Sequence, residues 1–190
     1  MEEKKEIFSC AKREDWRAWL AAHYREKKEI WFVFPKLAST EPGVSYNDAV
    51  EEALCFGWID GRAGTLDELH ALRRFTPRIK GSAYSRMNIE RLIRLEGRGM
   101  LLPEVREEVL PLITAPYVFP EDILREIEKD PAVRERFETF SPAYKRIRVA
   151  YIEAARHRPA EFEKRLENFI EKTREGKLIT GYGGIEEYYK

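Results

Sequence analysis

Hydrophobic and polar positions in the first part of the chain follow two different periods. Apolar residues recur at helical spacing between Trp16 and His23, which predicts an amphipathic helix over residues 11–26. The run EIWFVF at 29–34 is rich in aromatic and β-branched residues and stops at Pro35, so it predicts a strand. A helix followed by a strand is therefore expected to open the fold.

A second helix is predicted after the loop ASTEPGVS. Ser45 can cap its start, with Asp48 three residues further on as an acidic partner resembling a capping box, and Gly57 ends it. The next two segments, 58–66 and 69–78, are predicted to be strands. They lie too close in sequence for a crossover helix between them, so we expect them to pair antiparallel as a hairpin.

A third helix is predicted to open in the segment KGSAYSRMNIERLIRL, capped by Ser82 or Ser85. The order is helix–strand–helix–strand–strand–helix. It favours the α+β class, with a small antiparallel β-sheet and helices, over a doubly wound parallel sheet. We expect this domain to occupy residues 1–100.

Prolines mark the expected domain boundary. Four of the ten fall between residues 103 and 120, which predicts a Pro-rich linker over 101–120. A helical C-terminal module is predicted over 121–176. Its Asp-Pro and Ser-Pro pairs each place an N-cap residue before a proline at the first helical position. Residues 177–190 form a tail that is aromatic enough to dock on the rest of the protein.

Composition adds three facts to this picture. The 34 basic and 34 acidic residues give a net charge of zero, so the overall charge indicates no partner. Eight basic and three acidic residues fall between 62 and 94, however, which concentrates a net charge of +5 there. The 36% charged residues, together with the absence of Gln, indicate a thermostable protein.

Several classes of protein and site are disfavoured. The N-terminus lacks the apolar region of a signal peptide and the chain has no run of 18 apolar residues, so we expect a cytoplasmic protein without a membrane span. Cys10 and Cys55 form no CxxC pair and the histidines lack ligand spacing, so no metal and no cofactor is expected. Nucleic acid binding is disfavoured because the chain is neutral and the strands offer no platform of exposed rings. Nothing in the sequence indicates the oligomeric state.

The segment CFGWIDGRAG carries the first candidate site residues. Alternation along a strand places Trp58, Asp60 and Arg62 on one face, and Arg74 or Arg73 returns on the facing strand. The glycine pair in GRAG is typical of a β-bulge. We expect Trp58 to form a flat wall and Asp60 to orient an arginine.

The rest of the candidate site follows in RFTPRIKGSAYSRMN. Arg78 leaves the strand, and Ser85 and Asn88 lie one above the other on the first turn of the next helix. The N–H groups and the dipole at a helix N-terminus suit an anion, and an arginine fork would complete the pocket. A purely structural alternative stays open. In that reading Asp60 pairs with an arginine to brace the hairpin, Ser85 only caps the helix, and Trp58 is only core.

Four motifs in order, WRAWL, YNDAVEEALCFGWIDG, RFTPR and SAYSRMN, resemble the YdeI/OmpD-associated family, also called bacteriocin-protection proteins. The resemblance covers roughly residues 7–100, with Tyr84 where the family has Trp. The C-terminal helical module resembles the family as well, and keeps part of its AK…TR…R pattern as Ala155, Arg156 and Arg165. The resemblance implies a link to envelope stress or bacteriocin tolerance. It implies no established reaction or cofactor.

The leading hypothesis is a protein that binds a small anionic ligand in a stress or bacteriocin-protection role. Its expected ligand-binding residues are Trp58, Asp60, Arg74, Arg78, Ser82, Ser85 and Asn88. One alternative is an enzyme that acts on a phosphorylated or carboxylated small molecule, with Asp60 as the general base. Another is an interaction module without a small-molecule ligand. Cys55, at the C-terminal end of a helix, is expected to be buried and inert.

Overall fold

The computed structural model describes residues 5–181 and 183–189, and the contacts within it divide the chain into two compact units. The first unit runs to Tyr84 and takes up the chain again over Arg91–Ile113. The second comprises Ser85–Glu90 and the chain from Thr114 onward. The first unit has the predicted α+β architecture and the second is helical. None of the described helices is long and apolar enough to cross a membrane.

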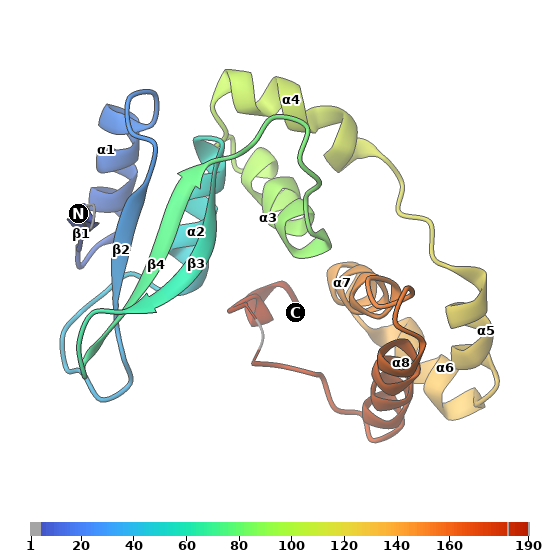
Figure 1. The fold of residues 1–190 in the computed structure, drawn as a ribbon. Coiled ribbons are helices and arrows are strands. Elements are labelled where there is room, and N and C mark those ends of the chain that lie inside the picture. Colours follow the sequence, from blue (N-terminus) through green and yellow to red (C-terminus); the bar gives the residue numbers. More distant parts are fainter. Residues whose placement is uncertain (1–4, 182, 190) are drawn as a thin grey trace. The chain divides into compact units, whose positions relative to one another are not determined.

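A four-stranded sheet with the order β1-β2-β4-β3 forms the centre of the first unit (Figure 1). Its strands are β1 (Ile7–Phe8), β2 (Ile30–Pro35), β3 (Trp58–Thr65) and β4 (His70–Pro77). The predicted antiparallel pairing of β3 with β4 is confirmed. The predicted small antiparallel sheet is present in β2, β4 and β3, and it becomes a mixed sheet at one edge, because β1 pairs parallel to β2. Two residues are too few to carry a periodic signal, so the sequence pattern missed this strand.

Two helices cover one face of this sheet. Helix α1 (Arg13–His23) and helix α2 (Tyr46–Cys55) enclose a core with the side chains of Phe32 and Phe75. Ser45 caps α2 as predicted, since its side chain accepts a hydrogen bond from the Asp48 amide. The opposite face holds a smaller cluster of Trp31, Val33 and Leu72. The alternation along β2 thus places apolar side chains on both faces, which explains its continuous apolar run.

A helix occupies part of the segment where prolines had predicted a linker. Helix α3 (Arg86–Gly97) is followed by helix α4 (Pro103–Thr114). Pro103 stands at the first helical position, where the missing N–H costs no hydrogen bond, and Pro111 lies inside the helix. The division between the two units falls between Ile113 and Thr114, at the end of this helix.

Besides the first turn of α3, the described part of the second unit contains four helices and a short terminal turn. These are α5 (Glu121–Glu128), α6 (Pro131–Thr139), α7 (Pro142–Glu153), α8 (Pro159–Arg174) and the 3₁₀ helix η1 (Glu186–Tyr189). Asp130 and Ser141 cap α6 and α7 ahead of a proline, as the sequence predicted. The tail docks on this unit. The ring of Tyr189 lies 4.7 Å from that of Tyr144, which also accepts a hydrogen bond from the Ile179 amide.

Candidate functional site

Trp58 belongs to the core of the first unit. Its side chain is 1% exposed, and its ring meets that of Trp19 edge to face with 6.0 Å between the centroids. The indole N–H donates to the carbonyl of Tyr24 at 3.1 Å, which satisfies the single polar atom of the ring. Gly57 precedes it with φ at +71°, a left-handed conformation that glycine adopts without strain and that ends α2. These contacts agree with the structural interpretation of Trp58.

The carboxylate of Asp60 is hydrogen-bonded to a tyrosine. The hydroxyl of Tyr46, at the start of α2, donates to Oδ2 of Asp60 at 2.6 Å. The guanidinium of Arg73 lies 5.2 Å from the centre of the Tyr46 ring. Burial, and then the bond to Asp60, raise the pKa of the Tyr46 hydroxyl. The tyrosine therefore stays protonated and acts as the donor.

A β-bulge overturns the expected alignment of Trp58, Asp60 and Arg62. The pairing register shifts between Asp60 and Ala63, so the bulge predicted from GRAG is confirmed. An extra residue at this point breaks the alternation that would have brought Arg62 to the face of Asp60. Arg62 instead lines a shallow surface hollow together with Arg74 and Trp31.

Arg74 faces away from Asp60. Asp60 pairs with Phe75, and neighbouring residues of a strand point to opposite faces, so Arg74 lies on the other side of the sheet. Its guanidinium forms an ion pair with Glu29, with 2.5 Å between Nη2 and Oε2. The sequence could not distinguish Arg73 from Arg74, because the register of the hairpin decides which of the two shares the face of Asp60.

Arg78 holds the loop that follows β4. Its Nη2 donates to the carbonyl and the hydroxyl oxygen of Ser82, both at 2.9 Å, and to the carbonyl of Ala83 at 3.2 Å. The guanidinium lies 3.5 Å from the centre of the Tyr84 ring, a close cation–π contact. Arg78 and Ser82 are thus brought together by contacts within the protein.

Ser85 caps α3, and it is one of the two residues, Ser82 and Ser85, that the sequence offered for this cap. Its hydroxyl oxygen accepts from the amide of Asn88 at 3.3 Å, and both residues belong to the second unit. Ser85 also lines a cavity of about 320 Å³ in that unit. The cavity is bordered by the first turn of α3, by α7 and by α8, and its lining residues are Ser85, Arg86, Met87, Ile147, Arg148, Ala150, Tyr151, Ala154 and Arg165.

A second cavity, of about 350 Å³, shares three residues with the first. Arg148, Tyr151 and Arg165 line both. The second cavity adds residues of α8 and of the tail, among them Asn168 and Thr180. Two adjoining hollows of the helical unit therefore meet at Arg148, which sequence reasoning had not selected.

Arg148 is a buried cation whose described partners are neutral. Its side chain is 4% exposed, and Nη2 donates to the carbonyl of Ile179 and, at 2.8 Å, to the hydroxyl of Tyr189. Nε has no hydrogen-bond partner among the described residues. No ion pair found within residues 5–181 and 183–189 involves Arg148. A buried charge usually has an opposite charge beside it, so an anion is the partner that this environment would accept.

The other two arginines of the first cavity have carboxylates beside them. Arg86 contacts Glu90, which is 3% exposed and also receives a bidentate pair from Arg146, with both N–O distances at 2.7 Å. Arg165 contacts Glu161 at 2.7 Å and lies 3.8 Å from the centre of the Tyr151 ring. Each of the two thus has a carboxylate partner, which Arg86 shares with Arg146, and this sets Arg148 apart.

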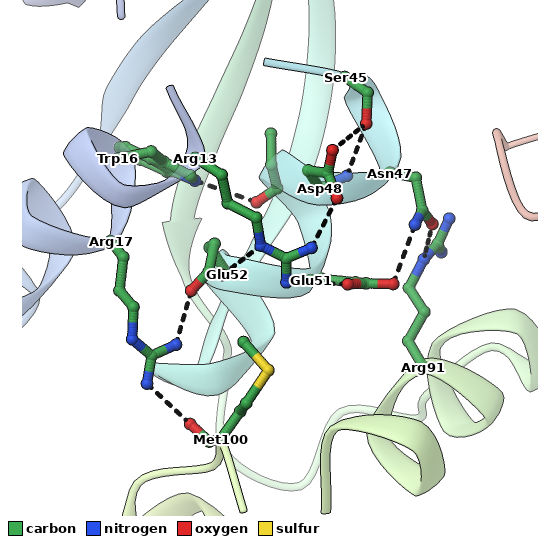
Figure 2. A network of polar contacts seen from close by, with 11 residues as sticks. Arg13, Trp16, Arg17, Ser45, Asn47, Asp48, Glu51, Glu52, Arg91 and Met100 are labelled. Carbon is green, nitrogen blue, oxygen red and sulfur yellow. Dashed lines mark hydrogen bonds and ion pairs between the residues drawn. The ribbon is translucent and has the colours of Figure 1, made fainter. Parts of the chain in front are cut away.

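The most extensive buried charge network lies elsewhere, between α1 and α2 (Figure 2). Glu51 and Glu52 are each 1% exposed. Arg13 reaches both carboxylates, at 2.8 Å and 2.5 Å, and Arg17 contacts Glu52 at 2.6 Å. The Arg13–Glu51 contact is an ion pair without hydrogen-bond geometry. Figure 2 shows the network continuing from Glu51 through Asn47 to Arg91.

This network has the character of a structural brace. It joins α1 to α2, and Arg17 extends it to the carbonyl of Met100 at 3.0 Å. Its charges are compensated by one another, and none of its carboxylates lines the cavities described above. Among the residues that the structure describes, no cluster of three or more His, Cys, Asp and Glu side chains has the arrangement of a metal site.

Taken together, the chain is a two-unit protein with an α+β unit braced by buried ion pairs and a helical unit that contains a basic cavity. It belongs to the family described as a domain of unknown function (DUF8412), whose model matches residues 8–108. Residues 116–176 match the family described as bacteriocin-protection, YdeI or OmpD-associated. No curated protein and no solved structure gives a significant match.

The two matches meet close to the boundary between Ile113 and Thr114, although the first also spans Ser85–Glu90 of the second unit. The first ends before Ile113 and the second begins after Thr114, where the two units separate. The expected YdeI/OmpD-associated relationship is thus confirmed for the helical part. The four motifs quoted for the resemblance lie in the range of the other family.

Proposed function

We propose that the protein binds a small anionic molecule in its helical unit, in a stress or bacteriocin-protection role. The observation that carries the proposal is Arg148, a 4% exposed guanidinium that lines two cavities and has only neutral described partners. A bound anion would compensate this charge in a site shielded from water, where the attraction is strong. The name of the family matched over 116–176 supports the protective role.

Binding has more support than catalysis. Asp60, the general base of the enzymatic alternative, already accepts a hydrogen bond from Tyr46. A base must reach the proton of a substrate, and this oxygen has a donor from within the protein. The expected ligand-binding role of Trp58, Arg74 and Arg78 stays a prediction.

The test is a titration of the folded protein with inorganic phosphate, sulfate, carboxylates and sugar phosphates at low ionic strength. We expect at least one of these anions to bind, and at 100 times its Kd to raise the apparent stability by about 2.7 kcal/mol. Arg148→Gln should abolish the binding. Arg136→Gln, a change at an arginine outside both cavities, serves as the control. If no anion binds to the wild-type protein, the proposal fails.

A further inference from the structure

The cavity that begins at the first turn of α3 has apolar walls and a cationic end. Met87, Ile147, Ala150 and Ala154 contribute hydrocarbon surface, and Arg148 contributes the charge. A hydroxyl-rich ligand such as a sugar phosphate would give up hydrogen bonds to water against these walls without replacement. A compact apolar group would give up no hydrogen bonds to water on entering this cavity.

The charge of the cavity also limits the ligand. Arg165 pairs with Glu161, and Arg86 shares Glu90 with Arg146, so Arg148 is the arginine of this lining that has no described carboxylate partner. A single negative charge is enough to pair with it. A carboxylate is the monoanion whose planar geometry best suits a guanidinium.

The volume sets the size of the apolar body. Pockets for drug-sized molecules span roughly 300–1,000 Å³, and this cavity of about 320 Å³ is at the lower end of that range. It is therefore suited to a body of one or two rings, or to a short branched chain.

We infer that the ligand is a monocarboxylate with a compact apolar or aromatic body, whose carboxylate pairs with Arg148 and whose body fills the cavity beside Ala150. The inference rests on the proposed function and makes it specific. It assigns the charged group of the ligand to Arg148, one of the three residues that line both cavities, and the body to only one of the two cavities.

The test compares four probes on the wild-type protein by calorimetric titration at low ionic strength. We expect phenylacetate to bind at least tenfold more tightly than acetate, which lacks the body, and than phenylacetamide, which lacks the charge. Inorganic phosphate should also bind at least tenfold more weakly than phenylacetate. Tighter binding of phosphate, or equal affinity for acetate and phenylacetate, would overturn the carboxylate inference and leave anion binding intact. If none of the probes, and no anion of the wider series, binds, both proposals fail.

Two substitutions locate the apolar body. Ala150→Leu enlarges a residue that lines only the cavity at α3, and leucine is compatible with the helix. This substitution should weaken the binding of phenylacetate at least tenfold and leave the affinity for acetate unchanged. Asn168→Phe enlarges a residue that lines only the other cavity and should leave both affinities unchanged. If Asn168→Phe blocks phenylacetate and Ala150→Leu does not, the body occupies the other cavity and the assignment is wrong.

Discussion

The hydroxyl group of Tyr46 donates a hydrogen bond to the carboxylate of Asp60, with 2.6 Å between the two oxygens. The contact joins the first residue of α2 to β3, just before the bulge in that strand. It gives the Asp in GWIDG a contact within the protein. The same carboxylate that sequence reasoning assigned to an anion site connects a helix to the sheet.

Removal of the hydroxyl should measure this connection. Tyr46→Phe leaves the ring in place and deprives the half-buried Asp60 carboxylate of a donor, so we expect a loss of about 1–2 kcal/mol in the free energy of unfolding. Chemical denaturation of Tyr46→Phe, Asp60→Ala and the double variant gives the coupling. Additive losses in the double variant would show that the two residues do not stabilise each other.

The buried pairs between α1 and α2 should be far more costly to break. Glu52→Gln keeps the shape of the side chain but leaves Arg13 and Arg17 without this carboxylate, so a loss of about 3–5 kcal/mol is expected. Glu29→Gln is the matched control. It breaks the pair with Arg74, in which both side chains are 41% exposed, and should cost less than about 1 kcal/mol. Similar losses in the two variants, measured by urea denaturation, would contradict this interpretation of the network.

His70 should make stability depend on pH. Its hydrogen bonds to Asp67 and then to Glu41 raise the pKa of the imidazole above its ordinary value. The folded protein therefore holds this proton more tightly than the unfolded chain. The stabilisation is complete below the unfolded pKa of about 6.5 and is lost as pH rises through the folded pKa. Between pH 6 and 9, wild-type stability should fall more steeply than that of His70→Gln. Parallel pH profiles would exclude this contribution.

The two cysteines should differ in their rate of alkylation. Burial raises the pKa of both thiols to about 11, so few thiolates form at neutral pH. Cys55 is 0% exposed, whereas Cys10 is half-buried. In the folded protein N-ethylmaleimide should modify Cys10 slowly and Cys55 last, as mass spectrometry of peptides can follow. Labelling of Cys55 at the rate of a free thiol would show that the C-terminal end of α2 is accessible to the reagent.

Local signals in the sequence predicted much of the fold. The caps Ser45, Asp130 and Ser141 and the hairpin of β3 and β4 were found because each depends on a few neighbouring residues. The two-residue strand β1 was missed because its pairing with β2 depends on residues distant in sequence. Glu51 and Glu52 were missed because every residue from Ala49 to Cys55 is buried, so α2 has no polar face over that stretch.

The candidate site was harder to predict because strand register and tertiary packing decide it. The bulge after Asp60 and the outward orientation of Arg74 depend on one residue of register. Arg148, by contrast, left a signal that was overlooked. Tyr144, Arg148 and Ile152 recur every four residues, so the arginine lies on the buried stripe of α7. A charged residue on such a stripe is either compensated within the protein or available to a ligand.

Arg78 and Arg148 provide the final comparison, since each is a candidate for holding an anion. Arg78 is already engaged by two oxygens of Ser82, by the carbonyl of Ala83 and by the Tyr84 ring. Arg78→Lys keeps the charge but loses the planar fork, so we expect a loss of about 1 kcal/mol in stability. Anion affinity, measured by the same calorimetric titration, should stay unchanged. In Arg148→Lys the affinity should fall at least tenfold, because Arg148 lines both cavities and lysine lacks the planar fork of a guanidinium. If Arg78→Lys binds the anion more weakly while its stability is preserved, the anion site lies at the loop after β4 and not at Arg148.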